Sequence, residues 1–248
     1  MSFTTIVLPY FKKDLFIEQT IQSILNQSHQ DFEIIIVDDE LSAQSYKIMR
    51  ELKKKDQRIN IIVNDKNIGA GLSRNKAIKF AKGSYIAFCD CDDLWDKFKL
   101  EKQLEFMNDK NIDFSFTAYN IVDEKGKIIG SRIANLDMSF KKLVNSCDIG
   151  LSTVMIKKDL FDKLKIFFPE IKTKEDYILW LNLSKNGVKM FGINEKLTSW
   201  RKSKNSLSSS SVQKILDGYK VYRHHLKYGI LKSLMCLLIL SLNFFLRK

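Results

Sequence analysis

The stretch YIAFCDCDDLW, residues 85–95, decides how this sequence is interpreted. Its first four residues are apolar and predict a buried strand, and the aspartates Asp90, Asp92 and Asp93 follow directly. Carboxylates this close repel one another unless a cation or strong hydrogen-bond donors offset their charge. A Mg²⁺ or Mn²⁺ ion bridging a diphosphate would do so, because hard cations prefer oxygen ligands. The alternative is a solvated acidic turn that caps the following helix.

Upstream of this stretch, apolar strands alternate with amphipathic helices. We expect strands at residues 4–8, 33–37, 59–63 and 85–88, and helices at about 14–26, 42–54 and 71–81. This alternation predicts an α/β fold, a Rossmann-like and mostly parallel sheet with helices on both faces. Such sheets bind ligands beyond the carboxyl ends of their strands, where Asp38, Asp39 and Asp90 stand in this sequence.

The pattern changes after Asp93. We expect strands at residues 114–122, 128–132, 153–156, 188–193 and 196–200, and helices at about 97–108, 158–164 and 177–185. No internal repeat is present, and no clear linker separates two domains. We therefore expect one α/β domain over residues 1–211 and a basic and apolar helical tail over residues 212–248.

Charge, motifs and cysteine spacing argue against a nucleic-acid-binding protein and against a zinc site. The 248 residues carry 41 basic and 29 acidic side chains, for a net charge of +12, which attracts nucleic acid, anionic lipid or phosphorylated substrates. No recognised nucleic-acid motif occurs, and part of the basic excess flanks the apolar tail, so we expect no nucleic-acid partner. The four cysteines show no CxxC pairing, and we reject a zinc site.

The tail, residues 220–248, combines an apolar run with flanking cations. The run of roughly 9–14 residues is shorter than the ~20 that a spanning helix needs, which favours a helix lying in the membrane interface and contacting anionic lipid. The alternatives are a helix packed on the domain core, or a dimer contact. Because no signal peptide is evident at the N-terminus, we expect a cytoplasmic protein, peripheral on the inner face of the cell membrane.

Four segments together carry a family resemblance. Residues 85–95, with Val-Leu-Pro-Tyr at 7–10, Ile-Val-Asp-Asp at 36–39 and Asn-Ile-Gly-Ala-Gly-Leu-Ser-Arg-Asn at 67–75, closely resemble family 2 glycosyltransferases of the GT-A fold. The resemblance runs from about residue 4 to 208, with the motifs in family order. It implies transfer of a sugar from a nucleotide-diphosphate donor of the UDP type to an acceptor hydroxyl on a lipid carrier, lipopolysaccharide or a similar surface glycan.

The resemblance also assigns roles in donor binding. It places Pro9 and Tyr10 beside the uracil, gives Asp39 a hydrogen bond from the base, and brings Arg74 to the base or the diphosphate. Asp90 would contact the ribose or the metal's water shell, and Asp92 would bind Mn²⁺ or Mg²⁺ directly. Asp93 would only orient the loop. The alternatives are a surface aromatic for Tyr10 and a helix-surface cation for Arg74.

The late segment adds two further predicted donor contacts. Residues 199–208 resemble the family segment in which an arginine and a serine, here Arg201 and Ser206, meet the diphosphate as a loop closes. An unstructured serine-rich loop without a role is the alternative. The Gln-x-x-Arg-Trp sequence of processive synthases is absent, which favours one sugar per encounter.

Glu175 and Asp176 open an apolar helix. An acidic pair there would also complement the helix dipole, which is the alternative. Family members carry this pair, and its aspartate is the general base, so Asp176 is the predicted base with Glu175 second. A carboxylate can take the acceptor's proton as its hydroxyl attacks the anomeric carbon, and direct attack inverts that carbon. The rival class is a noncatalytic nucleotide-sugar-binding scaffold of the same fold.

Overall fold

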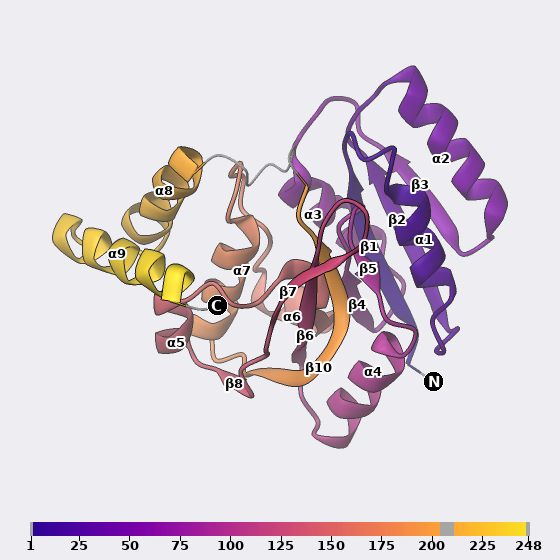
Figure 1. The fold of residues 1–248 in the computed structure, drawn as a ribbon. Helices are drawn as coiled ribbons and strands as arrows, with labels where there is room; N and C mark the ends of the chain where they lie inside the picture. The colour runs from indigo at the N-terminus through magenta and orange to yellow at the C-terminus, as the bar shows by residue number, and fades with distance from the viewer. Residues whose placement is uncertain (1, 204–210, 247–248) are drawn as a thin grey trace.

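The computed structural model describes residues 2–203 and 211–246, and within them the strands form a ten-stranded sheet (Figure 1). The strands are β1 Thr4–Tyr10, β2 Phe32–Asp38, β3 Ile59–Val63, β4 Tyr85–Phe88, β5 Leu94–Trp95, β6 Phe114–Val122, β7 Ile128–Arg132, β8 Asp137–Met138, β9 Met155–Lys157 and β10 Met190–Arg201. The α-helices are α1 Ile17–Leu25, α2 Ala43–Lys55, α3 Ala70–Phe80, α4 Lys99–Asp109, α5 Phe140–Asn145, α6 Asp159–Leu164, α7 Glu175–Lys185, α8 Ser211–Lys220 and α9 Ile230–Leu246.

The N-terminal half confirms the predicted parallel sheet. Strands β3, β2, β1 and β4 lie in that order, and each neighbouring pair is parallel. Alternate residues of β1 serve two cores: Ile6 and Leu8 pack with α1, α2 and α4, and Val7 packs with α3 and α7. Helices on both faces explain why these strands are apolar almost throughout.

The second half departs from the parallel pattern. Strand β9 lies between β4 and β6 and is antiparallel to both, whereas β10 is parallel to β6. The two closing strands expected at 188–193 and 196–200 form one strand, β10, whose pairing with β6 shifts register around Lys196. A residue that interrupts the ladder bends a strand without ending it. The prediction of two separate strands was therefore wrong.

The strand ends bring distant segments together. Because β1, β2 and β4 are parallel, their carboxyl ends share one edge, where Tyr10 lies opposite Asp38 and the Cys89 N–H donates to the Val7 carbonyl at 3.1 Å. The N-terminus of α2 is fixed at the same edge, since Ser45 Oγ donates to Asp38 Oδ2 at 2.7 Å. The predicted site residues that follow β1, β2 and β4 therefore share this edge.

The C-terminal helices pack on the main core. Figure 1 shows α8 and α9 beside α5 and α7, away from α1 and α2. The inner face of α9 buries Ser233, Cys236 and Leu240, and Asn243 Nδ2 donates to the Asn145 carbonyl at 2.8 Å. Packing of the tail on the core, one of the two alternatives, thus accounts for one face of α9. The division of the chain near residue 211 stays a prediction.

Candidate active site

Asp39, directly after β2, holds the loop that leads into α3. Its Oδ1 accepts hydrogen bonds from Asn64 Nδ2 at 2.7 Å and from the Ile68 N–H at 2.8 Å, and its Oδ2 accepts one from the Gly69 N–H at 2.8 Å. Gly69 has a φ of +84°, which favours glycine. A carboxylate oxygen can accept two hydrogen bonds, so Oδ2 keeps one position for a donor. The contact of Asp39 with a base stays a prediction.

Pro9 and Tyr10 end β1 beside Asp39, whose N–H donates to the Tyr10 carbonyl at 3.0 Å. The Tyr10 ring is fully buried in the core on the α1 side, and its hydroxyl donates to Asp14 Oδ1 at 2.7 Å. Burial, followed by the Asp14 carboxylate, raises the pKa of Tyr10. The alternative of a surface aromatic is therefore wrong, and the placement of Pro9 and Tyr10 beside a uracil stays a prediction.

Arg74 joins the acidic turn after β4 to the start of α7. Its Nη2 donates to Asp90 Oδ1 and its Nη1 to Glu175 Oε1, each at 2.7 Å. The Arg74 side chain is only 4% exposed, so the alternative of a helix-surface cation is wrong. Burial opposes the charge of Arg74, but both carboxylates favour it, and the net effect raises its pKa. Arg74 is thus a buried cation between two acids that lie 85 residues apart in the sequence.

The approach of α3 to α7 is close at Gly71. A Cβ on Gly71 would lie 3.2 Å from Glu175 Cγ and 3.2 Å from the Pro169 carbonyl oxygen. Both distances are tighter than ordinary van der Waals contact, and one neighbour is backbone, which cannot rotate away. Gly71 therefore lets α3 approach closely enough for Arg74 to reach Glu175.

Asp90 is the exposed carboxylate of the acidic turn, and Asp92 beside it is largely buried. The Asp90 side chain is 37% exposed, whereas the Asp92 side chain is 11% exposed and pairs with Lys13, Nζ to Oδ2, at 2.5 Å. Burial, then the charge of Asp90, raises the pKa of Asp92, and Lys13 lowers it. Asp92 therefore carries a negative charge that is poorly solvated and held by one flexible cation.

Asp93 and Arg201 support the turn from behind. Asp93 accepts hydrogen bonds from Ser152 Oγ at 2.5 Å and from the Arg201 N–H at 2.9 Å, and burial raises its pKa. Arg201 is buried, and its guanidinium donates to the Asp92 carbonyl at 2.8 Å, the Glu124 carbonyl at 2.9 Å and Gln19 Oε1 at 3.1 Å.

These contacts give Arg201 a supporting position that the sequence did not indicate. Its predicted contact with a diphosphate stays a prediction. Ser206, its predicted partner in that contact, lies outside the described residues.

Asp176 lies in the first turn of α7, where its Oδ1 accepts a hydrogen bond from the Tyr177 N–H at 2.7 Å. Lys174, before the helix, makes no capping hydrogen bond with its side chain. Burial, then the neighbouring Glu175 carboxylate, raises the pKa of Asp176 to about 6. Such a group is ionised at neutral pH and is a stronger base than an exposed aspartate, as general-base chemistry requires.

The acidic turn and the acidic pair lie on the same side of the molecule. The Arg74 bridge joins them, because its guanidinium donates to Asp90 of the turn and to Glu175 of the pair. The arrangement brings a pair of strand-end acids and a separate, more basic acid into one site.

The described residues hold no cluster of three or more carboxylate, imidazole or thiolate side chains placed to bind a metal. Mg²⁺ usually binds through one or two carboxylates together with substrate phosphates, so the protein need not supply the full shell. Asp92, with Asp90 beside it, fits that donor set by its oxygen chemistry and its weakly balanced charge.

Sequence reasoning missed the positioning residues of the site. Lys13 pairs with Asp92 across 79 positions, and Ser152 accepts from the Asp90 N–H at 2.9 Å while donating to Asp93. A lysine and a serine with no motif around them gave no signal. The link from Arg74 to Glu175 also needed the folded chain, since it depends on how α3 meets α7.

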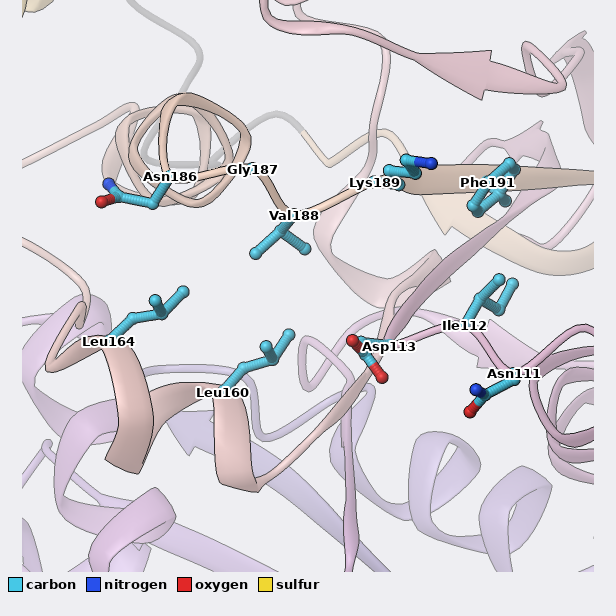
Figure 2. Close-up of a pocket in the computed structure, with 10 residues that line it drawn as sticks. All are labelled: Asn111, Ile112, Asp113, Leu160, Leu164, Asn186, Gly187, Val188, Lys189 and Phe191. Atoms are coloured by element: carbon cyan, nitrogen blue, oxygen red, sulfur yellow. The ribbon is translucent and has the colours of Figure 1, made fainter.

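A hollow of about 310 Å³ lies away from this site (Figure 2). Leu160, Leu164 and Val188 give it apolar walls, and Asp113 and Lys189 stand at its edge. It sits where β6 and β10 begin, whereas the acidic turn follows the carboxyl end of the parallel strand β4. The hollow therefore belongs to the opposite edge of the sheet.

Comparison with known sequences gives a consistent group of relatives. Residues 5–165 match the model of the family described as "Glycosyl transferase family 2". The chain is 36% identical over 233 residues to the putative teichuronic acid biosynthesis glycosyltransferase TuaG of Bacillus subtilis, covering 94% of this chain and 92% of that one. It is 34% identical over 245 residues to an Escherichia coli protein, UDP-Glc:alpha-D-GlcNAc-diphosphoundecaprenol beta-1,3-glucosyltransferase WfaP, covering 96% and 92%.

Solved structures show the same fold at low identity. The structure of S. aureus TarS residues 1–349 in complex with UDP-GlcNAc matches with a TM-score of 0.76 and 22% identity, over 96% of this chain and 70% of that one. The mannosyltransferase PcManGT from Pyrobaculum calidifontis, in complex with GDP-Man and Mn²⁺, matches with a TM-score of 0.70 and 13% identity, over 91% and 64%. These likenesses confirm the predicted GT-A architecture.

Proposed function

The chain belongs to glycosyl transferase family 2 and is a glycosyltransferase, and we propose that it is an inverting, nonprocessive enzyme that moves a sugar from a UDP-linked donor to a hydroxyl of a lipid-linked or surface-glycan acceptor. The observation that carries this proposal is the Arg74 bridge, which joins Asp90 of the acidic turn to Glu175 of the acidic pair at 2.7 Å each. A donor held at the turn would then lie within reach of a base on α7. The proposed catalytic domain is residues 1–211, with residues 212–248 as the tail.

The proposed base is Asp176, with Glu175 held beside it. Glu175 is paired with Arg74, so its charge is compensated, whereas Asp176 carries the raised pKa of about 6 and no ion pair is found for it among the described residues. Asp176 would take the proton of the acceptor hydroxyl while the oxygen attacks the anomeric carbon. Attack opposite to the leaving diphosphate inverts that carbon without a covalent intermediate.

Mn²⁺ or Mg²⁺ is the proposed cofactor, bound by Asp92 with Asp90 beside it. When bound, a divalent ion offsets the charge that develops on the leaving diphosphate. Arg74 would hold Asp90 in place, and Ser152 and Arg201 would hold the backbone of the turn. Pro9, Tyr10 and Asp39 remain the proposed contacts of the base, at the carboxyl ends of β1 and β2.

Two relatives are named for a UDP-glucose donor and a diphosphoundecaprenol-linked acceptor, which supports a UDP-sugar and a lipid-linked acceptor for this chain. The noncatalytic scaffold is not favoured, because the relatives are named as transferases and the raised pKa of Asp176 suits a base.

A screen of nucleotide-sugars with Mn²⁺ tests the donor. We expect one UDP-sugar to raise the melting temperature of the protein in the presence of Mn²⁺, because a ligand that binds only the folded state stabilises it by mass action. The same UDP-sugar with a lipid-diphosphate acceptor should give a product whose anomeric configuration, measured by NMR, is opposite to that of the donor. A product with the donor's configuration, or stabilisation only by GDP-sugars or CMP-sugars, would contradict the proposal.

We propose peripheral attachment to the inner face of the cell membrane through α9. Within the described residues, no helix combines the length and apolarity needed to cross a bilayer. The outer face of α9 exposes Leu231, Met235 and Leu238 by 80%, 63% and 61%, at helical spacing. Two exposed cations, Lys227 and Lys232, lie at the N-terminal end of this stripe. An apolar stripe beside cations suits the surface of an anionic bilayer, where a lipid-linked acceptor would be found.

Replacing Leu231, Met235 and Leu238 together by glutamate should release the protein from vesicles that contain phosphatidylglycerol, because the stripe is lost while the inner face of α9 stays intact. Flotation measures the bound fraction. The matched control carries glutamate at three exposed side chains of the N-terminal half, Leu15, Tyr46 and Phe80, and should still float. Equal flotation of the two triple variants would contradict attachment through α9.

A further inference from the structure

Lys13 makes the ion pair that balances Asp92. It follows β1 in the loop that leads to α1, and its Nζ lies 2.5 Å from Asp92 Oδ2 and 3.3 Å from Ser203 Oγ. The Lys13 side chain is 22% exposed, so the ammonium reaches inward from the edge of the site. Among the described residues, the Asp92 carboxylate makes no other ion pair. Arg201 donates a hydrogen bond to the Asp92 backbone carbonyl and not to its carboxylate.

The same carboxylate is the proposed metal ligand, and one oxygen cannot serve both cations well. Mg²⁺ binds its oxygen ligands at about 2.0–2.1 Å. A divalent ion on Asp92 would therefore lie within a few ångströms of an ammonium that stayed on Oδ2, and the two would repel each other strongly in a partly buried site. Lysine can move away, because its charge sits on a flexible stem of four carbons.

We propose that Lys13 is an exchangeable counter-ion. Its ammonium pairs with Asp92 before a divalent cation binds, and the side chain then moves so that the ammonium pairs with the diphosphate of the donor. A released ammonium needs a new anion, and the phosphates of a donor bound at the acidic turn would offer one. Lys13 is thus a positioning residue that links metal binding to donor binding. This inference rests on the proposed function, because it assumes that Asp92 is the metal ligand.

The exchange predicts opposite effects on two affinities. In Lys13→Met, Mn²⁺ alone should bind about tenfold more tightly than in the wild type, because no ammonium competes for Asp92. UDP at saturating Mn²⁺ should bind about tenfold more weakly, because the diphosphate loses a cation. The free Mn²⁺ signal in electron paramagnetic resonance gives the first affinity, and calorimetry with UDP gives the second.

Lys12→Met is the matched control, since it removes the same charge one residue away. Lys12 is exposed, and its Nζ lies 5.2 Å from the centre of the ring of the adjacent Phe11. Neither affinity should change more than about twofold in this control. Lys13→Gln is a second test variant, which keeps a hydrogen-bond donor toward Asp92 but removes the charge. It should change both affinities as Lys13→Met does, and it serves as the test if Lys13→Met has a lowered melting temperature.

Unchanged Mn²⁺ affinity in both Lys13 variants would overturn the inference, because it would make the ion pair purely structural. The proposed function would survive that result if Asp92→Asn still abolished Mn²⁺-dependent UDP binding. If the wild type bound no Mn²⁺ even with UDP present, the metal part of the proposed function would fail, and the inference with it.

Discussion

Asp176→Asn should lower kcat by about 10²–10⁴-fold while leaving the affinity for UDP with Mn²⁺ unchanged. Asparagine keeps the shape of the side chain and cannot accept the proton of the acceptor hydroxyl. Asp176 is the group with the pKa of about 6, so kcat/KM of the wild type should decline below about pH 6, and this decline should be absent from the residual activity of the variant. Steady-state kinetics between pH 5 and 8 measures both effects.

Stability provides the check that the variant is folded. The pKa of Asp176 is raised in the folded protein, so the folded state binds this proton more tightly than the unfolded state does. The contribution of Asp176 to the free energy of unfolding therefore falls as the pH rises toward about 6 and stays lowered above it. Asparagine carries no charge, so the variant should melt at the same temperature as the wild type or a higher one at pH 7.5.

Asp159→Asn is the matched control for Asp176→Asn. Asp159 also stands in the first turn of a helix, α6, where it pairs with Lys163 at 2.5 Å on the opposite edge of the sheet. The activity of Asp159→Asn should equal that of the wild type. Near-normal turnover of Asp176→Asn would move the base role to another group, with Glu175 the first to test.

Asp92→Ala should weaken UDP binding in the presence of Mn²⁺ by more than about 100-fold, with a matching loss of activity. A divalent ion at this site would have only one or two protein carboxylates, so losing one removes much of its protein shell. Calorimetry with UDP, with and without Mn²⁺, measures the effect. We expect the variant and the wild type to bind UDP equally weakly when no metal is present.

The control for Asp92→Ala is Asp109→Ala, at the exposed end of α4, which removes the same charge far from the acidic turn. Its UDP affinity should match that of the wild type. Unchanged Mn²⁺-dependent affinity in Asp92→Ala would remove Asp92 as the metal ligand and leave Asp90 as the candidate. Circular dichroism of both variants should show native helix content, since alanine keeps the backbone carbonyl that accepts the Arg201 hydrogen bond.

The first half of the fold could be predicted from the sequence because its signals are local. Continuous apolar runs such as β2 and periodic helices such as α1 need no knowledge of distant residues. The second half could not be predicted as well. β5 and β8 have two residues each, too few for any periodicity, and the two strands expected from the pattern around Lys196 proved to be one irregular strand.

The site followed the same rule. The acidic turn was recognisable because its aspartates are adjacent, and Asp176 because it opens a helix beside Glu175. Burial was not recognisable: Tyr10 and Arg201 carry polar groups that predict contact with solvent or ligand, yet both side chains are enclosed by residues distant in sequence. The partner of each such group depends on the packing of whole elements.

The close contact between α3 and α7 limits which segments of this enzyme can be replaced by those of its relatives. A chimera that took α7 from another transferase would place a new neighbour against Gly71 and a new counter-charge against Arg74. The change would reach the acidic turn through the Arg74–Asp90 ion pair. Grafts intended to alter acceptor choice should therefore exchange residues 70–75 and 169–176 as one cassette. Replacing only one of these two segments would disturb its contacts with the segment that was kept.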